Sequence, residues 1–144
     1  MVFILLTKIK RNKEIKMKLV DIVGARKVIS TKAAEMLEFR LAYKFAKFIK
    51  LTNDDEEFYT KHQKKLIEQY GKKDDEGNII PDESGCYQFD NDNVKLLNEK
   101  LKELADTDIE IPENLKFSEE ELTALKFSIE EALSLSDLIK VDAE

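Results

Sequence analysis

The stretch from Glu38 to Gly71 constrains the fold more than any other part of the chain, because apolar residues recur in it at three- and four-residue spacing among charged residues. This spacing places them on one side of an α-helix. An unbroken helix of this length would span about 50 Å at 1.5 Å per residue. The recurring residues are Leu41, Phe45, Phe48, Tyr59, His62, Leu66 and Tyr70.

A polar run, Thr52-Asn53-Asp54-Asp55, interrupts this pattern halfway along. One interpretation is a single long helix with a local defect, which we favour. The other is a second helix that begins here, because threonine and asparagine side chains accept hydrogen bonds from the first free amides of a helix. Acidic residues would then suit the positive end of the second helix.

Length and composition favour one mainly helical domain. Glycine (4) and proline (2) are scarce in a chain of 144 residues, whereas all-β folds need many turn residues. A chain of this length forms one ordinary domain rather than two. We predict a mainly α fold in which a long central helix, or a helical hairpin, packs with three shorter helices and a small β-hairpin near residues 78–89.

Local signals place the other elements. N-cap candidates precede a helix at 92–106, and Ser118 followed by Glu121 is a capping box that opens a helix at 119–133. Two β-like runs, at 79–81 and 86–89, flank a turn cluster and predict the hairpin. The remaining predictions are a helix from Leu19 to about Met36, a bend near Glu35 to Glu38, and a short extended segment from Asp108 to Pro112.

The first 16 residues differ from the rest in charge. Residues 1–18 carry six cations and one acid, a net charge of +5, which leaves −11 for residues 19–144 because the whole chain carries −6. We interpret residues 1–16 as a basic N-terminal extension, which could be an upstream start before Met17, a tail or an added strand, and residues 17–144 as the domain. A basic arm for nucleic acid or an anionic membrane is the alternative. The acidic body itself disfavours nucleic acid as a partner.

Cysteine use and hydropathy predict a cytoplasmic protein. A single cysteine, Cys86, excludes an internal disulfide and agrees with a reducing compartment. The apolar run Val2–Leu6 is shorter than that of a secretory signal, and no run approaches the roughly 20 residues of a membrane span.

No residue pattern predicts an enzyme, a cofactor site or a metal site. The only histidine, His62, lies among the packing positions of the long helix, and Cys86 lies far from it in sequence. Counted from Asp74, the sixth position of a calcium loop is Ile79 instead of glycine. Zinc, di-iron and phosphate-loop motifs are missing as well.

Surface residues of the long helix are the candidate binding residues. Most aromatics of this segment are expected in the core, but Phe39 and Phe58 are candidates for the side away from it, and exposed aromatics anchor interfaces. The acidic run that follows Asn53 reads as a solvated segment or a cap, and it could also contact a partner. Its members are Asp54, Asp55, Glu56 and Glu57.

Several segments occur in a distinctive order: Leu41–Lys47, Lys65–Gly71, the Asp-Asp-Glu-Gly-Asn turn, and Leu122–Glu130. In this order, most of residues 17–133 resembles a family of small uncharacterised proteins from phages and prophages of Gram-positive bacteria. That family often has proline where Glu38 stands, so the resemblance leaves the bend near residue 37 open. It implies a genetic context and no catalytic residues, because the family has no established activity.

The leading hypothesis is a non-enzymatic phage or prophage protein that binds a host or phage protein. As an inhibitor of a host defence protein, its acidic surface would cover a basic site. One alternative is a virion or assembly accessory protein, and another is a sponge for a small nucleotide signal, which needs a basic pocket. The heptad-like pattern leaves a homo-oligomer open, because a second chain could also satisfy it.

Overall fold

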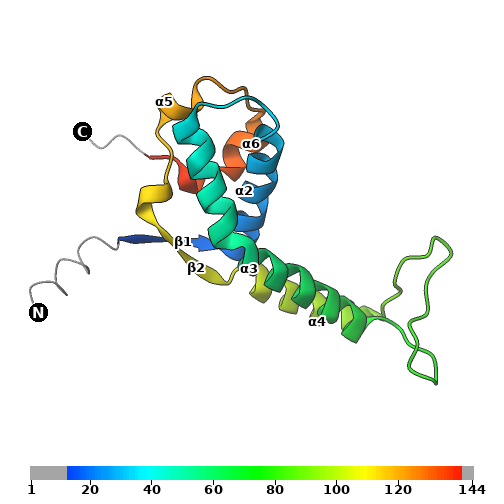
Figure 1. Cartoon of the computed structure of the whole chain (residues 1–144). Helices are drawn as coiled ribbons and strands as arrows, with labels where there is room; N and C mark the ends of the chain where they lie inside the picture. The colour runs from blue at the N-terminus through cyan, green and yellow to red at the C-terminus, as the bar shows by residue number, and fades with distance from the viewer. Residues whose placement is uncertain (1–12, 141–144) are drawn as a thin grey trace, which may run out of the picture.

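The long helix is the central element of the molecule, and it joins a packed body to a projecting arm (Figure 1). The computed structural model describes residues 13–140. Helix α3 (Phe39–Tyr70) is one continuous helix of 32 residues, so the prediction of one long helix is confirmed. It ends at Gly71, where a Cβ atom would lie 3.2 Å from the carbonyl oxygen of Ile67.

The first half of α3 packs in the body against helix α2 (Leu19–Lys32), which is shorter than predicted. The turn between the two helices, residues 33–38, lies where the bend was expected. The second half of α3 leaves the body and packs with helix α4 (Asn91–Ala105), and these two helices form the arm (Figure 1). The predicted mainly α fold class is therefore confirmed.

A two-stranded antiparallel sheet joins the start of the described chain to the segment that follows α4. Strand β1 (Glu14–Lys18) pairs with strand β2 (Asp108–Pro112), the extended segment expected from the sequence. Because β1 begins at Glu14, residues 14–16 belong to a strand, which agrees with the interpretation of the extension as an added strand. The rest of the predicted extension, residues 1–12, lies outside the described residues.

The chain reverses direction near residues 78–89, as the predicted hairpin requires, but no paired strands form there. Isolated bridges join Lys73 to Ile79 and Pro81 to Tyr87, but the segment contains no regular strand. Two tight turns follow one another closely here, so too few residues remain between them for a ladder. Pro81 also lacks the N–H group that a ladder needs.

The predicted helix at 119–133 is two short helices, α5 (Glu119–Leu122) and α6 (Ile129–Ser134). The Ser118 capping box is present, but a second capping box at Ser128 begins a new helix. As a result Ile129 and Leu133, which were expected to be buried, are 81% and 68% exposed. Two short 3-10 helices, η1 (Glu113–Leu115) and η2 (Ser136–Leu138), lie on either side of this pair.

The core lies in the body between α2, the first half of α3, the sheet and the C-terminal segment. Phe45 and Phe117 meet edge to face, with ring centroids 5.2 Å apart, and join α3 to the segment before α5. In the arm, only Leu97 and Leu104 of α4 are buried. The largest fully buried side chains are Phe48, Phe117, Met17, Leu19, Ile22, Ile29, Ile111, Leu135 and Leu138.

Candidate functional site

The loop at the far end of the arm, residues 71–90, contains two turns of the same design (Figure 1). In the first turn, Asp74 accepts two backbone N–H hydrogen bonds at its Oδ1 atom, from Glu76 and Asn78, both at 2.9 Å. Its own backbone N–H donates to the carbonyl of Asn78 at 2.8 Å. The aspartate side chain therefore fixes its own turn, as such residues commonly do.

The second turn repeats this arrangement eight residues later, at Asp82. Its Oδ1 accepts backbone N–H hydrogen bonds from Ser84 at 2.8 Å and Cys86 at 2.9 Å, and one from the Ser84 hydroxyl at 2.7 Å. These hydrogen bonds lower the pKa of Asp82, and the bond from the Ser84 side chain has the largest effect. Each turn ends on a glycine with a φ of +87°, Gly77 or Gly85, a conformation that L side chains rarely adopt.

This tip loop, defined as residues 71–90, combines negative charge with exposed apolar side chains. It carries six carboxylates against two lysines, a net charge of −4. The side chains of Ile80 and Tyr87 are 37% and 39% exposed. An apolar centre surrounded by polar groups is a common arrangement at protein interfaces. The carboxylates are Asp74, Asp75, Glu76, Asp82, Glu83 and Asp90.

The acidic run on α3, one of the predicted binding segments, is partly used inside the protein. Arg26 of α2 reaches α3 and forms an ion pair with Glu56. It also donates to the carbonyl of Ile49 at 2.7 Å, to the Thr52 hydroxyl at 2.7 Å and to Asn53 at 2.9 Å. The polar break in the helix is thus the binding site of one arginine, and Glu56 is not free for a partner.

The other three members of the run differ in exposure. Asp55 is partly buried, and this burial, followed by the neighbouring Asp54 charge, raises its pKa although Arg26 opposes the shift. Asp54 is exposed, and Glu57 is exposed in an ion pair with Lys61 at 3.7 Å. Within the described residues, Asp54 is therefore exposed without an ion pair, and Glu57 is exposed within a pair on its own helix.

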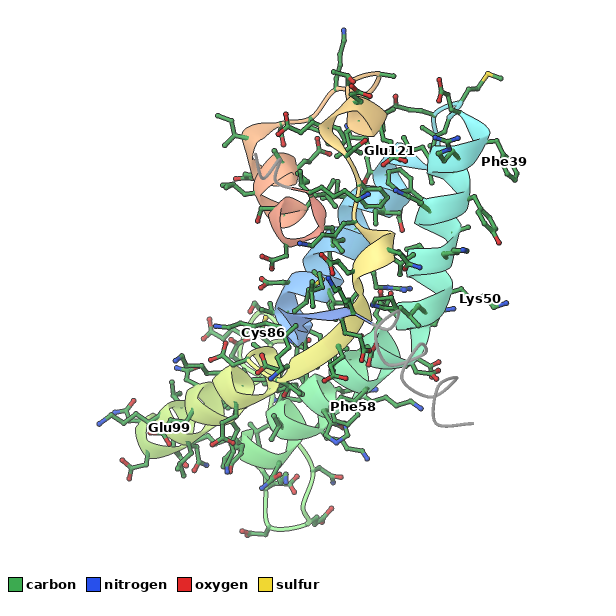
Figure 2. The ribbon with its side chains drawn as sticks, turned by 90° about the vertical axis from the view of Figure 1, so that its left-hand side faces the viewer. Phe39, Lys50, Phe58, Cys86, Glu99 and Glu121 are labelled. Atoms are coloured by element: carbon green, nitrogen blue, oxygen red, sulfur yellow. The ribbon has the colours of Figure 1, made fainter. Side chains whose placement is uncertain are left out.

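The predicted aromatic residue Phe39 lies on the outer side of α3, where its side chain is 81% exposed (Figure 2). Its ring stacks on that of Tyr43, with centroids 5.7 Å apart and planes 9° apart. The Lys47 ammonium lies 4.6 Å from the centroid of the Tyr43 ring. Three residues one turn apart thus form a continuous stack on the surface of the first half of α3.

Phe58 is 45% exposed and contacts His62, whose ring centroid lies 3.9 Å away. The Nδ1 atom of His62 is 3.2 Å from the carbonyl oxygen of Phe58 on the same helix. His62 therefore contacts Phe58 of its own helix. Cys86 is an exposed free cysteine in the tip loop.

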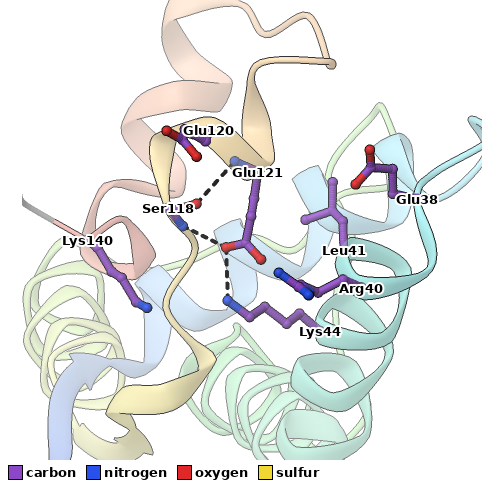
Figure 3. Close-up of a pocket in the computed structure, with 8 residues that line it drawn as sticks. All are labelled: Glu38, Arg40, Leu41, Lys44, Ser118, Glu120, Glu121 and Lys140. Atoms are coloured by element: carbon purple, nitrogen blue, oxygen red, sulfur yellow. Dashed lines mark hydrogen bonds and ion pairs between the residues drawn. The ribbon is translucent and has the colours of Figure 1, made fainter.

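A pocket of about 420 Å³ opens between the start of α3 and the segment around α5 (Figure 3). Three cationic residues and three glutamates line it, and the central cation is already paired. Lys44 lies 2.9 Å from Glu121 and donates to the carbonyl of Lys116 at 2.9 Å. The pocket therefore lacks the excess of positive charge that a nucleotide would need. Its charged residues are Glu38, Arg40, Lys44, Glu120, Glu121 and Lys140.

The carboxylate of Glu121 gives this pocket a pH dependence. Burial alone would raise its pKa, but the Ser118 backbone N–H at 2.8 Å and the Lys44 ion pair lower it overall. The Glu121 carboxylate therefore contributes its full stabilisation above the unfolded-state pKa of about 4.3. This stabilisation is lost as pH falls through the lower pKa of the folded state.

We expect Glu121→Gln to lose less stability than the native chain on acidification from about pH 6 to about pH 3.5. The glutamine keeps the shape of the side chain but cannot be protonated in this range. Urea unfolding at both pH values measures the difference. Glu120→Gln, an exposed neighbour in the same helical turn, is the control and should behave like the native chain. An equal acid response in all three proteins would contradict the assignment.

Comparison with known proteins adds no relative. No protein-family model, no curated protein and no solved structure matches the chain. Within residues 13–140, no group of three or more histidine, cysteine, aspartate or glutamate side chains could hold a metal ion. In the same part of the chain, no helix is both long enough and apolar enough to cross a membrane.

Proposed function

We propose that this chain is a non-enzymatic binding protein that contacts another protein through the tip loop. One observation carries the proposal: the arm holds residues 71–90 away from the core, and both turns of this loop are fixed by aspartate side chains. A loop that is ordered before binding loses less conformational entropy when a partner is bound. Such an arm can place the loop in a recessed site.

The chemistry of the loop indicates the partner. A net charge of −4 favours a basic site, and charge complementarity speeds encounter and selects the partner. Ile80 and Tyr87 would enter an apolar recess within that basic site, because buried apolar anchors supply most of the affinity of an interface. Proteins that bind nucleic acids carry basic surfaces.

The biological setting that we propose is a phage or prophage in its bacterial host, with the protein inhibiting a defence component such as a nuclease. This setting rests on the resemblance inferred from the order of the helical segments and the acidic turn in the sequence. By occupying the basic site of the target, the tip loop would exclude nucleic acid from it. The cytoplasm of the host is the compartment in which the two proteins would meet.

Charge reversal in the tip loop tests the proposal. We expect Glu76→Lys with Glu83→Lys to abolish rescue of a sensitive phage in a host with an intact defence system, and to prevent recovery of a stoichiometric host protein. Neither side chain fixes a turn, since Asp74 and Asp82 do so. The matched control, Glu35→Lys with Glu99→Lys, makes the same change in net charge at exposed positions outside the loop.

The result is decisive in either direction. Rescue by the native chain and the control, with loss only in the loop variant, supports the proposal. Equal rescue by all three proteins excludes the tip loop, and absence of rescue together with absence of a bound host protein excludes inhibition. Detection of the chain in purified phage particles by mass spectrometry would instead identify a virion or assembly protein.

A further inference from the structure

The outer side of α3 carries a second surface, separate from the tip loop. Residues at three- and four-residue spacing form a line along it, and all of them are exposed. Figure 2 shows two labelled residues of the first half of α3, Phe39 and Lys50, on the side of the helix that faces away from the body. We call this line the α3 stripe: Phe39, Tyr43, Lys47, Lys50, Asp54, Glu57 and Lys61.

Charge changes sign along the α3 stripe. From Phe39 to Leu51 the helix carries four cationic residues and no acidic residue, and then four acidic residues follow from Asp54 to Glu57. Within residues 13–140, the ion pairs include neither Lys50 nor Asp54. The centre of the stripe thus presents opposite charges side by side that are not satisfied by the described fold.

The order of these residues is symmetric about Thr52. Lys50 and Asp54 lie two positions on either side of it, and Lys47 and Glu57 lie five positions on either side. In an antiparallel pair of helices related by a two-fold axis, residues equidistant from the axis face one another. With the axis at the level of Thr52, Lys50 and Lys47 of each copy face Asp54 and Glu57 of the other. The dimer therefore contains each of these two ion pairs twice.

The aromatic end of the stripe obeys the same symmetry. Tyr43 and Lys61 each lie nine positions from Thr52, so Lys61 of a second copy would reach the Tyr43 ring. Lysine already uses this ring within the chain, since Lys47 lies 4.6 Å from its centroid. Phe39, at 81% exposure, would lose contact with water in the same step.

We propose that two copies of this chain associate through the α3 stripe in an antiparallel dimer. The self-complementary charge order favours a second copy over an unrelated protein, because an unrelated acidic or basic partner would meet like charges along half of the stripe. Exposed ion pairs contribute about 0–1 kcal/mol each, so the aromatic contacts must supply much of the affinity. The tip loops lie at opposite ends of such a dimer and remain free.

A charge-swap experiment tests the dimer. One variant carries Lys47→Glu with Lys50→Glu, and the other carries Asp54→Lys with Glu57→Lys. Each variant alone places like charges opposite one another in the dimer, so we expect each to associate about tenfold or more weakly than the native chain. An equimolar mixture restores opposite charges at every pair, so we expect it to recover a dimer containing one copy of each variant.

Sedimentation velocity and light scattering of the full chain measure the mass, and circular dichroism shows that each variant is folded. The control, Lys27→Glu with Lys95→Glu, makes the charge change of the first variant at exposed positions outside the stripe and should leave the dimer intact. A dimer in the native chain that is lost in both variants and recovered in their mixture supports the proposal. A monomeric native chain, or variants that remain dimeric alone, would overturn it.

Discussion

Arg26→Met is expected to lower the free energy of unfolding by about 2–4 kcal/mol, because it removes the cation on which four α3 groups converge. The arginine side chain is 12% exposed, whereas its ion-pair partner Glu56 is 43% exposed. Solvent screens the Glu56 charge, so the loss stays below that of a fully buried pair. Most of the cost comes from leaving the Ile49 carbonyl and the Thr52 hydroxyl without this donor.

Urea unfolding monitored by circular dichroism measures the change. Lys27→Met is the matched control, since it removes a cation from the next position of the same helix at an exposed site, and we expect a change within about 0.5 kcal/mol. Arg26→Lys should recover only part of the loss, because an ammonium cannot reproduce the fork of guanidinium hydrogen bonds. Equal stability of Arg26→Met and Lys27→Met would contradict the role assigned to Arg26.

Phe48→Ala is expected to cost about 3–5 kcal/mol, which is enough to unfold a large fraction of a marginally stable domain. The Phe48 side chain is completely buried in the body. Its removal loses the transfer free energy of the ring and leaves a cavity that the packed neighbours can fill only in part.

Phe39→Ala is the matched control on the same helix. That ring is 81% exposed, so in dilute solution the free energy of unfolding should change by about 0.5 kcal/mol or less. Thermal unfolding and urea titration distinguish the two variants directly. If Phe48→Ala kept full stability and altered only the mass in solution, Phe48 would belong to an interface between chains instead of the core.

The long helix could be predicted because its signal is local. Leu41, Phe45 and Phe48 follow one another at helical spacing, and side chains at this spacing share a face whatever the rest of the chain does. The same reasoning found α4 and the capping box at Ser118. It failed at Ser128, where a second capping box was present in the sequence and its repetition could have predicted the break.

The partner of a strand could not be predicted in this way. Asp108 to Pro112 was recognised as extended, but its pairing with Glu14 to Lys18 joins segments about 90 residues apart. The strand at Glu14 carries too few apolar residues to stand out beside a basic segment. Pairing over such a distance depends on how the intervening helices return the chain, which no local pattern encodes.

In the candidate site, too, local sequence patterns placed some residues correctly but did not reveal contacts between distant residues. Phe39 and Phe58 were candidates for the outer side of the long helix, although most aromatics of this segment were expected in the core, and both are exposed. The acidic run was treated as one surface, but Glu56 forms an ion pair with Arg26. The only sign of this arginine in the sequence was the polar break at Thr52, whose hydroxyl accepts a hydrogen bond from it. A break of this kind in an apolar pattern is the signal that a charged partner must lie opposite.

By itself the sequence determined the helical class and the end of α3 at Gly71, because these depend on hydrogen bonds and side-chain contacts within a few residues of one another. It left open whether the helix continues through Thr52, where the structure shows one helix with Arg26 bound to the polar run. Only the tertiary structure decided which acids are free, which lysines are paired and that the tip loop stands away from the core. Those properties depend on distances between residues far apart in the chain, and packing alone sets these distances.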